Sequence, residues 1–209
     1  MRRVLAILAA GSATRAGIDK VLADLGGQPV VAWSIAAGVA AGCFDEIVVT
    51  APADRMGAVA AVAGERARVV AGGATRTASS WRALDAAAGA QIIALHDAAR
   101  PFVPPSLFAK CVEIAAREGS AVAGLPLADT VRRADEAGVA TEEVAREGLW
   151  SVQTPQVFRC ELLARARAAV GDRTFSDDAA ALSAAGITPR MVLGERRNLK
   201  ITTFEDLAY

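Results

Sequence analysis

The chain has 209 residues and carries 23 lysines and arginines against 23 aspartates and glutamates, so its formal net charge is zero. This balance excludes the strong positive field that recruits nucleic acid or an anionic membrane. The hydrophobic fraction of 53% and the charged fraction of 22% are typical of a folded globular protein and exclude a disordered chain. At this length we expect one domain, residues 1–209, and the lack of an apolar run of about 18 residues predicts no membrane span.

The three cysteines, Cys43, Cys111 and Cys160, lie far apart in the sequence. Their odd number and their spacing predict neither a disulfide framework nor a zinc cluster. They are typical of the reducing cytoplasm, where we expect this chain to be located. The apolar run at residues 4–10 is at the short limit for a signal peptide, and we interpret it as a first buried strand.

Short runs rich in valine and isoleucine alternate with longer alanine-rich stretches along the first 125 residues. Strands that alternate with helices in this way form a mostly parallel sheet flanked by helices, so the expected fold class is α/β. Runs that are apolar at consecutive positions predict strands covered on both faces. The strands are predicted at residues 3–8, 46–51, 67–72, 91–96 and 120–125, and the helices near residues 29–41, 53–63, 75–88 and 105–117.

The pattern changes at residues 127–148, which are polar and contain no long apolar face. We interpret this segment as a protruding β-arm, a hairpin with its turn around Asp135–Gly138. The chain ends at Tyr209, just inside a last expected helix, which leaves a further domain beyond that residue open. Between the arm and that helix we expect helices near residues 160–170 and 177–185, a strand at residues 190–194, and the last helix from residue 204.

In an open parallel sheet, ligands bind beyond the carboxyl ends of the strands. The first strand is followed by Ala9-Ala10-Gly11-Ser12-Ala13-Thr14-Arg15, and Lys20 comes shortly after. Small residues leave backbone N–H groups open to phosphate oxygens and the two cations supply charge, so this loop is a candidate phosphate site. The alternative is a solvated turn with two surface cations. The G-x-G-x-x-G and G-x-x-x-x-G-K-[ST] fingerprints are both missing, which disfavours a nicotinamide-dependent oxidoreductase and a P-loop ATPase.

A second candidate anion site follows the third run, where the sequence reads Gly72-Gly73-Ala74-Thr75-Arg76 before a helix that carries Ser79. Paired glycines permit a close approach of the backbone, and the first turn of a helix offers free N–H donors. The alternative is a glycine turn in which Thr75 is the N-cap of the helix.

The fourth run is followed by His96-Asp97-Ala98-Ala99-Arg100-Pro101. Asp97, at the end of a buried strand and near two candidate phosphate loops, is suited to hold Mg²⁺, because this ion uses one or two carboxylates and completes its shell with phosphates and water. The alternative is a structural Asp97–Arg100 pair that closes a turn. His96 is the only histidine, which excludes a histidine-rich zinc site and favours a core or supporting role.

Three later stretches combine polar groups that either join the same edge of the sheet or form solvated faces. These stretches are residues 129–133 together with Arg146, residues 153–156, and residues 196–200.

Covalent catalysis by a nucleophile finds little support, because the G-x-S-x-G elbow is missing and no cysteine stands in an evidently electropositive motif.

Together these motifs resemble a known family over nearly the whole chain. They read, in order, AAGSATR, DKVLADLGGQPVVAWSI, GGATRTAS, HDAARPFV, PLADTVRRA, REGLWSVQTPQVF, SDDAAAL and NLKITTFEDL. The sequence is similar to the 2-C-methyl-D-erythritol 4-phosphate cytidylyltransferases of the non-mevalonate isoprenoid pathway. HDAARP and GLW-x-x-Q-TPQ-x-F are the specific parts, whereas the opening loop is shared by many nucleotidyltransferases.

The resemblance implies a single domain like that of the nucleotide-diphospho-sugar transferases, whose arm clasps a second subunit in a homodimer. It implies a Mg²⁺-dependent reaction of CTP with a polyol phosphate, methylerythritol 4-phosphate, that gives the CDP-alcohol and pyrophosphate. The implied catalytic cations are Arg15, Lys20 and Lys200, and the implied metal ligand is Asp97. The implied nucleotide contacts are Ala9, Ala10, Gly11, Gly73 and Ser79. The implied acceptor contacts are Arg100, Thr130, Arg146 and Thr154, of which Thr130 and Arg146 would reach the substrate of the neighbouring subunit.

The opening loop departs from the family pattern. Ala13 stands where the second glycine of G-x-G-x-R is usual, and its methyl group is tolerated only where φ is negative. Asp19 and Val21 flank Lys20 in place of the usual proline and glutamine, and the stretch from Arg15 to Lys20 is shorter. Two alternatives therefore share the expected fold: a ribitol 5-phosphate cytidylyltransferase, and a catalytically degenerate relative that only binds CTP.

Overall fold

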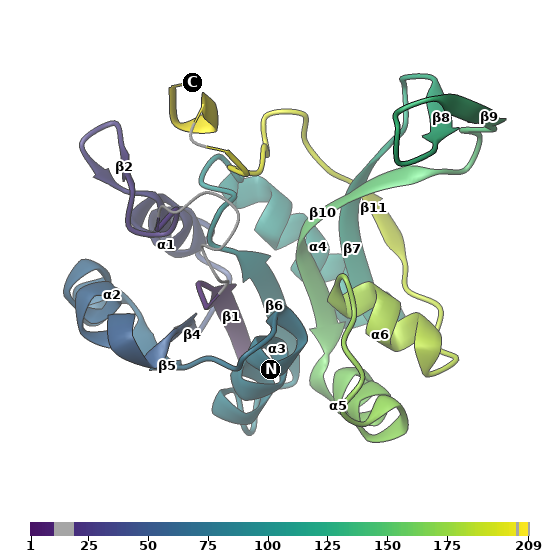
Figure 1. The fold of residues 1–209 in the computed structure, drawn as a ribbon. Helices are drawn as coiled ribbons and strands as arrows, with labels where there is room; N and C mark the ends of the chain where they lie inside the picture. The colour runs from purple at the N-terminus through teal and green to yellow at the C-terminus, as the bar shows by residue number, and fades with distance from the viewer. Residues whose placement is uncertain (11–18, 204, 209) are drawn as a thin grey trace.

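A seven-stranded sheet forms the centre of the computed structural model, which describes residues 1–10, 19–203 and 205–208 (Figure 1). Strand β10 runs antiparallel to both of its neighbours, and every other pairing within this sheet is parallel. The predicted α/β class with a mostly parallel sheet is therefore confirmed. In spatial order the strands are β11 (Met191–Leu193), β7 (Ser120–Pro126), β10 (Trp150–Arg159), β6 (Ile92–Asp97), β1 (Arg3–Leu8), β4 (Glu46–Ala51) and β5 (Arg68–Ala71).

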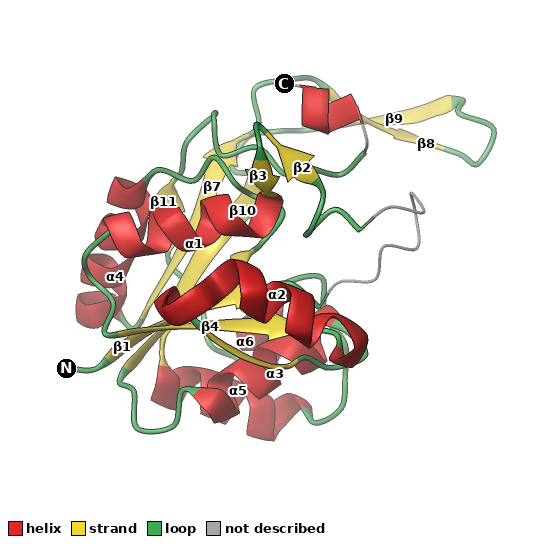
Figure 2. Cartoon of the chain, turned by 90° about the vertical axis from the view of Figure 1, so that its left-hand side faces the viewer, coloured by secondary structure: helices red, strands yellow, loops and turns green. Residues whose placement is uncertain are grey.

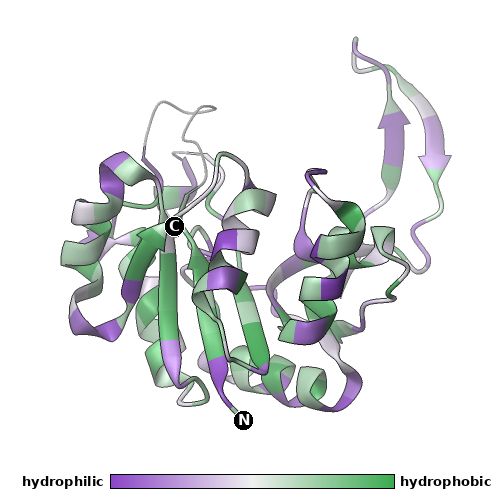
Figure 3. Cartoon of the chain, turned by 90° about the horizontal axis from the view of Figure 1, so that it is seen from below, coloured by the Kyte–Doolittle hydropathy of each residue, from purple (hydrophilic) through white to green (hydrophobic). Residues whose placement is uncertain are grey.

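Helices cover both faces of this sheet, because its inner strands are apolar on both sides. In β1, Leu5 and Ile7 pack with α1, α2 and α4 on one face, whereas Val4 and Ala6 pack with α3, α5 and α6 on the other. Figure 3 shows the same pattern as hydrophobic colour along the central strands. The helices are α1 (Val30–Ala40), α2 (Met56–Ala63), α3 (Arg76–Ala86), α4 (Pro105–Glu118), α5 (Cys160–Val170) and α6 (Asp178–Ala184).

The structure differs from the sequence-based expectation at some elements. The strand predicted at residues 67–72 is the edge strand β5, whose residues are half-buried or exposed instead of covered on both faces. The helix predicted near residues 53–63 begins with a 3₁₀ turn, η1 (Ala53–Arg55), and the last helix is the short 3₁₀ turn η3 (Glu205–Ala208). A further 3₁₀ turn, η2 (Gly64–Arg66), leads into β5. None of the described helices has the length and apolarity that crossing a membrane requires.

Two small sheets lie outside the main one. The strands β2 (Asp24–Leu25) and β3 (Gln28–Pro29) pair ahead of α1. The strands β8 (Val131–Ala134) and β9 (Ala140–Val144) form an antiparallel hairpin within residues 127–148, which we call the arm. Its turn is closed by a hydrogen bond from the Gly138 backbone N–H to the Asp135 carbonyl, 3.0 Å, and Gly138 has the positive φ that such a turn requires. Figure 2 shows this hairpin extending away from the main sheet.

Candidate active site

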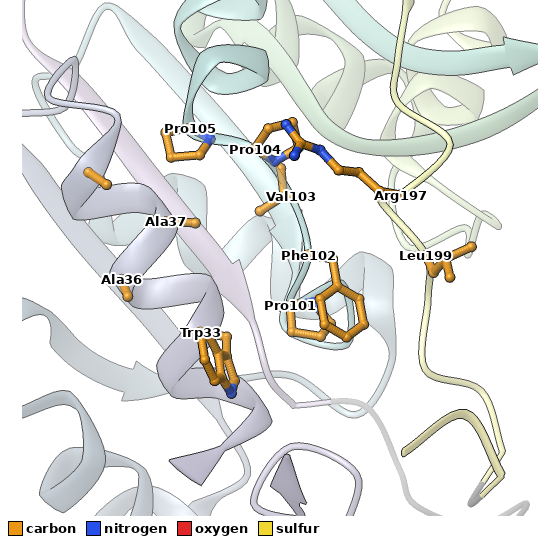
Figure 4. Close-up of a pocket in the computed structure, with 11 residues that line it drawn as sticks. Trp33, Ala36, Ala37, Pro101, Phe102, Val103, Pro104, Pro105, Arg197 and Leu199 are labelled. Carbon is orange, nitrogen blue, oxygen red and sulfur yellow. The ribbon is translucent and has the colours of Figure 1, made fainter. Parts of the chain in front are cut away.

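A charged pocket of about 270 Å³ lies beyond the carboxyl end of β6. It is formed where β6 ends, where α3 begins, where the pairing of β10 with β7 shifts register, and where the segment before α6 passes close to residue 200. Larger hollows exist, but the one between α1 and residues 101–105 is mainly apolar (Figure 4). A second larger hollow, at the base of residues 127–148, is also lined by charged residues, but these are exposed. Of these three pockets only the smaller one contains a buried carboxylate in contact with two cations, so we take it as the candidate site. Its lining is Arg76, Asp97, Arg100, Val152, Gln153, Thr154, Gln156, Ser176, Asp177 and Lys200.

Asp97 is the acidic centre of this pocket and has a cation on each carboxylate oxygen. Lys200 Nζ lies 2.7 Å from Oδ2, and Arg76 Nε lies 3.2 Å from Oδ1. Burial alone would raise the pKa of Asp97, but Arg76 and Lys200 outweigh it and hold that pKa well below its usual range. The carboxylate is therefore ionised at neutral pH.

The alternative prediction of a structural ion pair between Asp97 and Arg100 is wrong, since Asp97 pairs with Arg76 and Lys200 instead. The Arg100 guanidinium donates to the backbone carbonyl of Asn198, 2.8 Å, and more weakly to that of Val152, 3.4 Å. Burial lowers the pKa of Arg100, although Asp97 acts in the opposite direction. Arg100 thus reaches the pocket as a cation held by carbonyl oxygens, and within residues 1–10, 19–203 and 205–208 its guanidinium has no direct ion pair.

Thr154 and His96 fix the backbone around Asp97. The Thr154 hydroxyl accepts a hydrogen bond from the Asp97 backbone N–H, 3.1 Å, and lies 3.0 Å from His96 Nδ1. His96 Nε2 lies 3.2 Å from the Arg100 carbonyl, which can only accept, so Nε2 carries the proton and the threonine hydroxyl donates to Nδ1. Burial lowers the pKa of His96 to about 4, which keeps the ring neutral. The expectation of a supporting role for His96 agrees with this geometry.

The paired glycines bring the ends of β1 and β5 close to α3. A Cβ on Gly73 would overlap the Cβ of Ala78, and a Cβ on Gly72 would overlap that of Ala10. The Ser79 hydroxyl accepts a hydrogen bond from the Gly73 backbone N–H, 3.1 Å. Thr75 is the N-cap of α3, as the alternative reading of this turn predicted. The close approach of the backbone and the N-cap therefore occur together, and they bring Ala10, Gly73 and Ser79 to one place. Ala9 precedes Ala10, and its backbone N–H donates to the Thr50 carbonyl.

The remaining predicted residues lie apart from this cluster or outside the described chain. Gly11 and Arg15 fall within residues 11–18, which the structure does not describe. Lys20 is half-buried in a turn, and the carboxylate of its neighbour Asp19 is held by Arg55 at 3.1 Å. That ion pair compensates the negative charge which the sequence puts beside Lys20.

Thr130 and Arg146 belong to the arm and do not line the pocket of their own chain. Both are exposed, and the Arg146 guanidinium donates to the Ala128 carbonyl at the base of the arm. Within one chain the structure thus gathers Asp97, Arg100, Thr154 and Lys200, and it does not bring the two arm residues to them.

Sequence reasoning missed two charged residues of the pocket region. Arg76 bridges Asp97 and Asp178, with its Nη1 2.9 Å from Asp178 Oδ2. Asp178 is fully buried, and burial raises its pKa although Arg76 acts against this. Both residues stand in the motifs GGATR and SDDAAAL, but nothing local in either motif reveals that they meet across about half of the chain.

The fold and the pocket define a class, an α/β protein with a cationic site beyond the strand ends that suits phosphorylated ligands. Residues 4–209 match the family described as "IspD: 2-C-methyl-D-erythritol 4-phosphate cytidylyltransferase". The chain belongs to this family.

Curated relatives and solved structures agree with this membership. The chain is 42% identical over 210 residues to the 2-C-methyl-D-erythritol 4-phosphate cytidylyltransferase of Deinococcus radiodurans, covering 99% of this chain and 87% of the relative. It is 44% identical to a bifunctional enzyme IspD/IspF of Anaeromyxobacter, covering 99% of this chain but 56% of that protein, so the chain spans about half the length of such bifunctional relatives. The crystal structure of the cytidylyltransferase from Thermus thermophilus superposes with a TM-score of 0.83 at 35% identity, covering 100% of this chain and 96% of that one.

Proposed function

We propose that this chain transfers the cytidylyl group of CTP to 2-C-methyl-D-erythritol 4-phosphate and releases pyrophosphate. The observation that carries the proposal is the convergence of Arg100, Lys200 and Thr154 around the ionised Asp97, at the strand ends where ligands of parallel sheets bind. The family membership supplies the substrate pair.

The reaction needs alignment and charge neutralisation from the protein. An oxygen of the acceptor phosphate attacks the α-phosphorus of CTP, a new P–O bond forms, and the bond to pyrophosphate breaks in line. Arg100 and Lys200 bind the acceptor phosphate, while Arg15 and Lys20 neutralise the triphosphate. Ala9, Ala10, Gly11, Gly73 and Ser79 contact the nucleotide, since small residues leave backbone groups open to its phosphates.

Mg²⁺ fits this site through a single carboxylate. Asp97 is ionised, and its Oδ2 is paired with the half-exposed Lys200, which can turn away. Among the described residues there is no group of three or more His, Cys, Asp or Glu side chains that could hold a metal alone. Asp97 would therefore hold the ion together with nucleotide phosphates and water, and the ion would neutralise the triphosphate charge.

We further propose that the protein works as a homodimer joined through the arm, and that Thr130 and Arg146 serve the neighbouring subunit's acceptor. Their exposure, and their separation from the pocket of their own chain, support this arrangement. The cysteines Cys43, Cys111 and Cys160 are free thiols, which supports a location in the reducing cytoplasm.

Pyrophosphate release with CTP and Mg²⁺ tests the function, with methylerythritol 4-phosphate and ribitol 5-phosphate supplied in separate reactions. We expect release with methylerythritol 4-phosphate and a product with the mass of the CDP-alcohol. Preference for ribitol 5-phosphate would move the protein to the other acceptor with the same chemistry. A folded protein that binds CTP and is silent with both acceptors would be the degenerate relative, and the opening loop would be the first region to restore.

A further inference from the structure

Arg76 is a buried guanidinium held between two carboxylates from different parts of the fold. It stands at the first position of α3, Asp97 ends β6, and Asp178 begins α6. Its Nε lies 3.2 Å from Asp97 Oδ1 and its Nη1 lies 2.9 Å from Asp178 Oδ2. The fork of an arginine can meet two acids in this way, whereas the single ammonium of a lysine cannot hold both in the same directions.

Asp178 is the fixed end of this chain of charges. Its backbone N–H and that of Ala179 both donate to Gln156 Oε1, at 3.1 and 3.0 Å. Gln156 Nε2 in turn donates to Asp177 Oδ2, 3.0 Å, and Asp177 caps α6. Arg76 is thereby paired with an aspartate whose backbone Gln156 holds at the start of α6 and whose side chain is buried.

Lys200 is the movable end. Its side chain is 42% exposed, compared with 23% for Arg76 and 2% for Asp178. The groups joined by direct ion pairs are two cations, Arg76 and Lys200, and two carboxylates, Asp97 and Asp178, so their charges balance in the absence of ligand. If Lys200 turns to a substrate phosphate, one negative charge is left in the buried cluster, and a cation that takes its place at Asp97 Oδ2 restores the balance.

We propose that Arg76 is a positioning residue for the cytidylyl transfer. Asp178 holds Arg76, and Arg76 keeps Asp97 Oδ1 fixed while a divalent cation replaces Lys200 at Asp97 Oδ2. This inference rests on the proposed function, because it assumes the same acceptor phosphate and divalent cation. The carboxylate keeps its direction during the exchange, so the cation and the phosphate arrive at defined places. In this role Arg76 acts through the carboxylate of Asp97.

A double-mutant cycle with Arg76→Lys and Asp97→Asn tests the positioning role. Turnover is measured against Mg²⁺ concentration, and CTP affinity is measured by calorimetry with Mg²⁺ and with EDTA. We expect Arg76→Lys to raise the Mg²⁺ concentration for half-maximal rate about 10- to 100-fold, as is typical when a group that orients a metal ligand is removed. The ratio of CTP affinities with and without Mg²⁺ should fall by a similar factor. In the Asp97→Asn background the same substitution should have an effect below about twofold, because positions that act through one group are not additive.

Arg82→Lys is the matched control, since Arg82 lies exposed on the same helix; it should leave the Mg²⁺ dependence unchanged. Equal losses from Arg76→Lys with and without Asp97→Asn, or an unchanged affinity ratio, would overturn the proposal. If Arg76→Lys does not fold, Asp178→Asn replaces it in the cycle with the same expected direction. Wild-type silence in pyrophosphate release would overturn the proposed function instead, and the affinity ratio would still decide the role of Arg76.

Discussion

The arm and the pocket are both built on arginine–carboxylate pairs, yet the surroundings give these pairs different roles. On the arm, Arg133 faces Glu142 at 3.2 Å, and both side chains are more than 60% exposed. In the pocket, Arg76 faces Asp178 at 2.9 Å, and the aspartate is 2% exposed. Water screens the first pair and is excluded from the second.

The exposed and the buried ion pairs differ in how much each contributes to stability. Exposed pairs contribute about 0–1 kcal/mol, so the arm holds its strand register weakly and keeps its charges available to another surface. Loss of one partner from a buried pair costs about 3–5 kcal/mol, so Arg76 and Asp178 hold their charges in fixed directions. The exposed charges of the arm are the ones that the proposed homodimer would use, and the buried charges of the pocket are the ones that the proposed reaction would use.

Lys20→Ala should produce the largest effect on turnover, because Lys20, which does not line the pocket itself, is the cation proposed for the triphosphate. Removal of one charge-stabilising donor typically lowers the rate about 100- to 1000-fold, so turnover should fall by that factor while the melting temperature stays close to wild type. Steady-state pyrophosphate release and thermal unfolding measure the two quantities. Lys110→Ala is the matched control, because Lys110 bonds the Leu193 carbonyl away from the pocket. Near-normal turnover in Lys20→Ala would remove the role assigned to this lysine.

Asp178→Ala and Glu142→Ala sharpen the contrast in stability. The first substitution takes a buried partner from Arg76 and should lower the free energy of unfolding by about 3 kcal/mol. The second removes an exposed partner from Arg133 and should lower it by less than about 1 kcal/mol. Urea denaturation of both variants measures the difference, and similar losses in the two would break the comparison.

The pH dependence of the free energy of unfolding gives a smaller effect, which comes from the buried His96 next to Asp97. Burial lowers the pKa of His96 to about 4 from 6.5, so between these values the unfolded chain binds a proton that the folded chain does not. Stability from this group is complete above pH 6.5, and the free energy of unfolding should fall by about 2 kcal/mol from pH 7 to pH 5. Because His96 is the only histidine, His96→Asn should flatten this dependence. An unchanged slope in that variant would show that another group titrates.

The strands of the sheet could be predicted where the sequence has a run of consecutive apolar residues. The strands at residues 3–8 and 46–51 keep their predicted bounds, because consecutive apolar residues cover both faces of each. The antiparallel strand β10 was not assigned, since its polar QTPQ interrupts the apolar pattern where the pairing with β7 shifts register. The polar composition of residues 127–148 did reveal the hairpin.

The site could be predicted only in part for the same physical reason. Residues that follow a strand directly, such as Asp97 and Gly73, are marked by their place in the chain. Arg76 and Asp178 are neighbours only because α3 and α6 pack on the same face of the sheet, which no local pattern contains. Lys200 was singled out, but its pairing with Asp97 depends equally on tertiary packing.

Mixed dimers provide the most direct test that the arm of one subunit completes the pocket of the other. One chain carries Arg146→Ala and the other Lys200→Ala; the two are co-expressed, and each is also made alone as a control of low activity. If the arm serves the partner, each mixed dimer contains one intact site, so random assembly should restore about a quarter of wild-type turnover. If the arm serves its own chain, every site carries one defect, and the mixture should be no more active than the two controls.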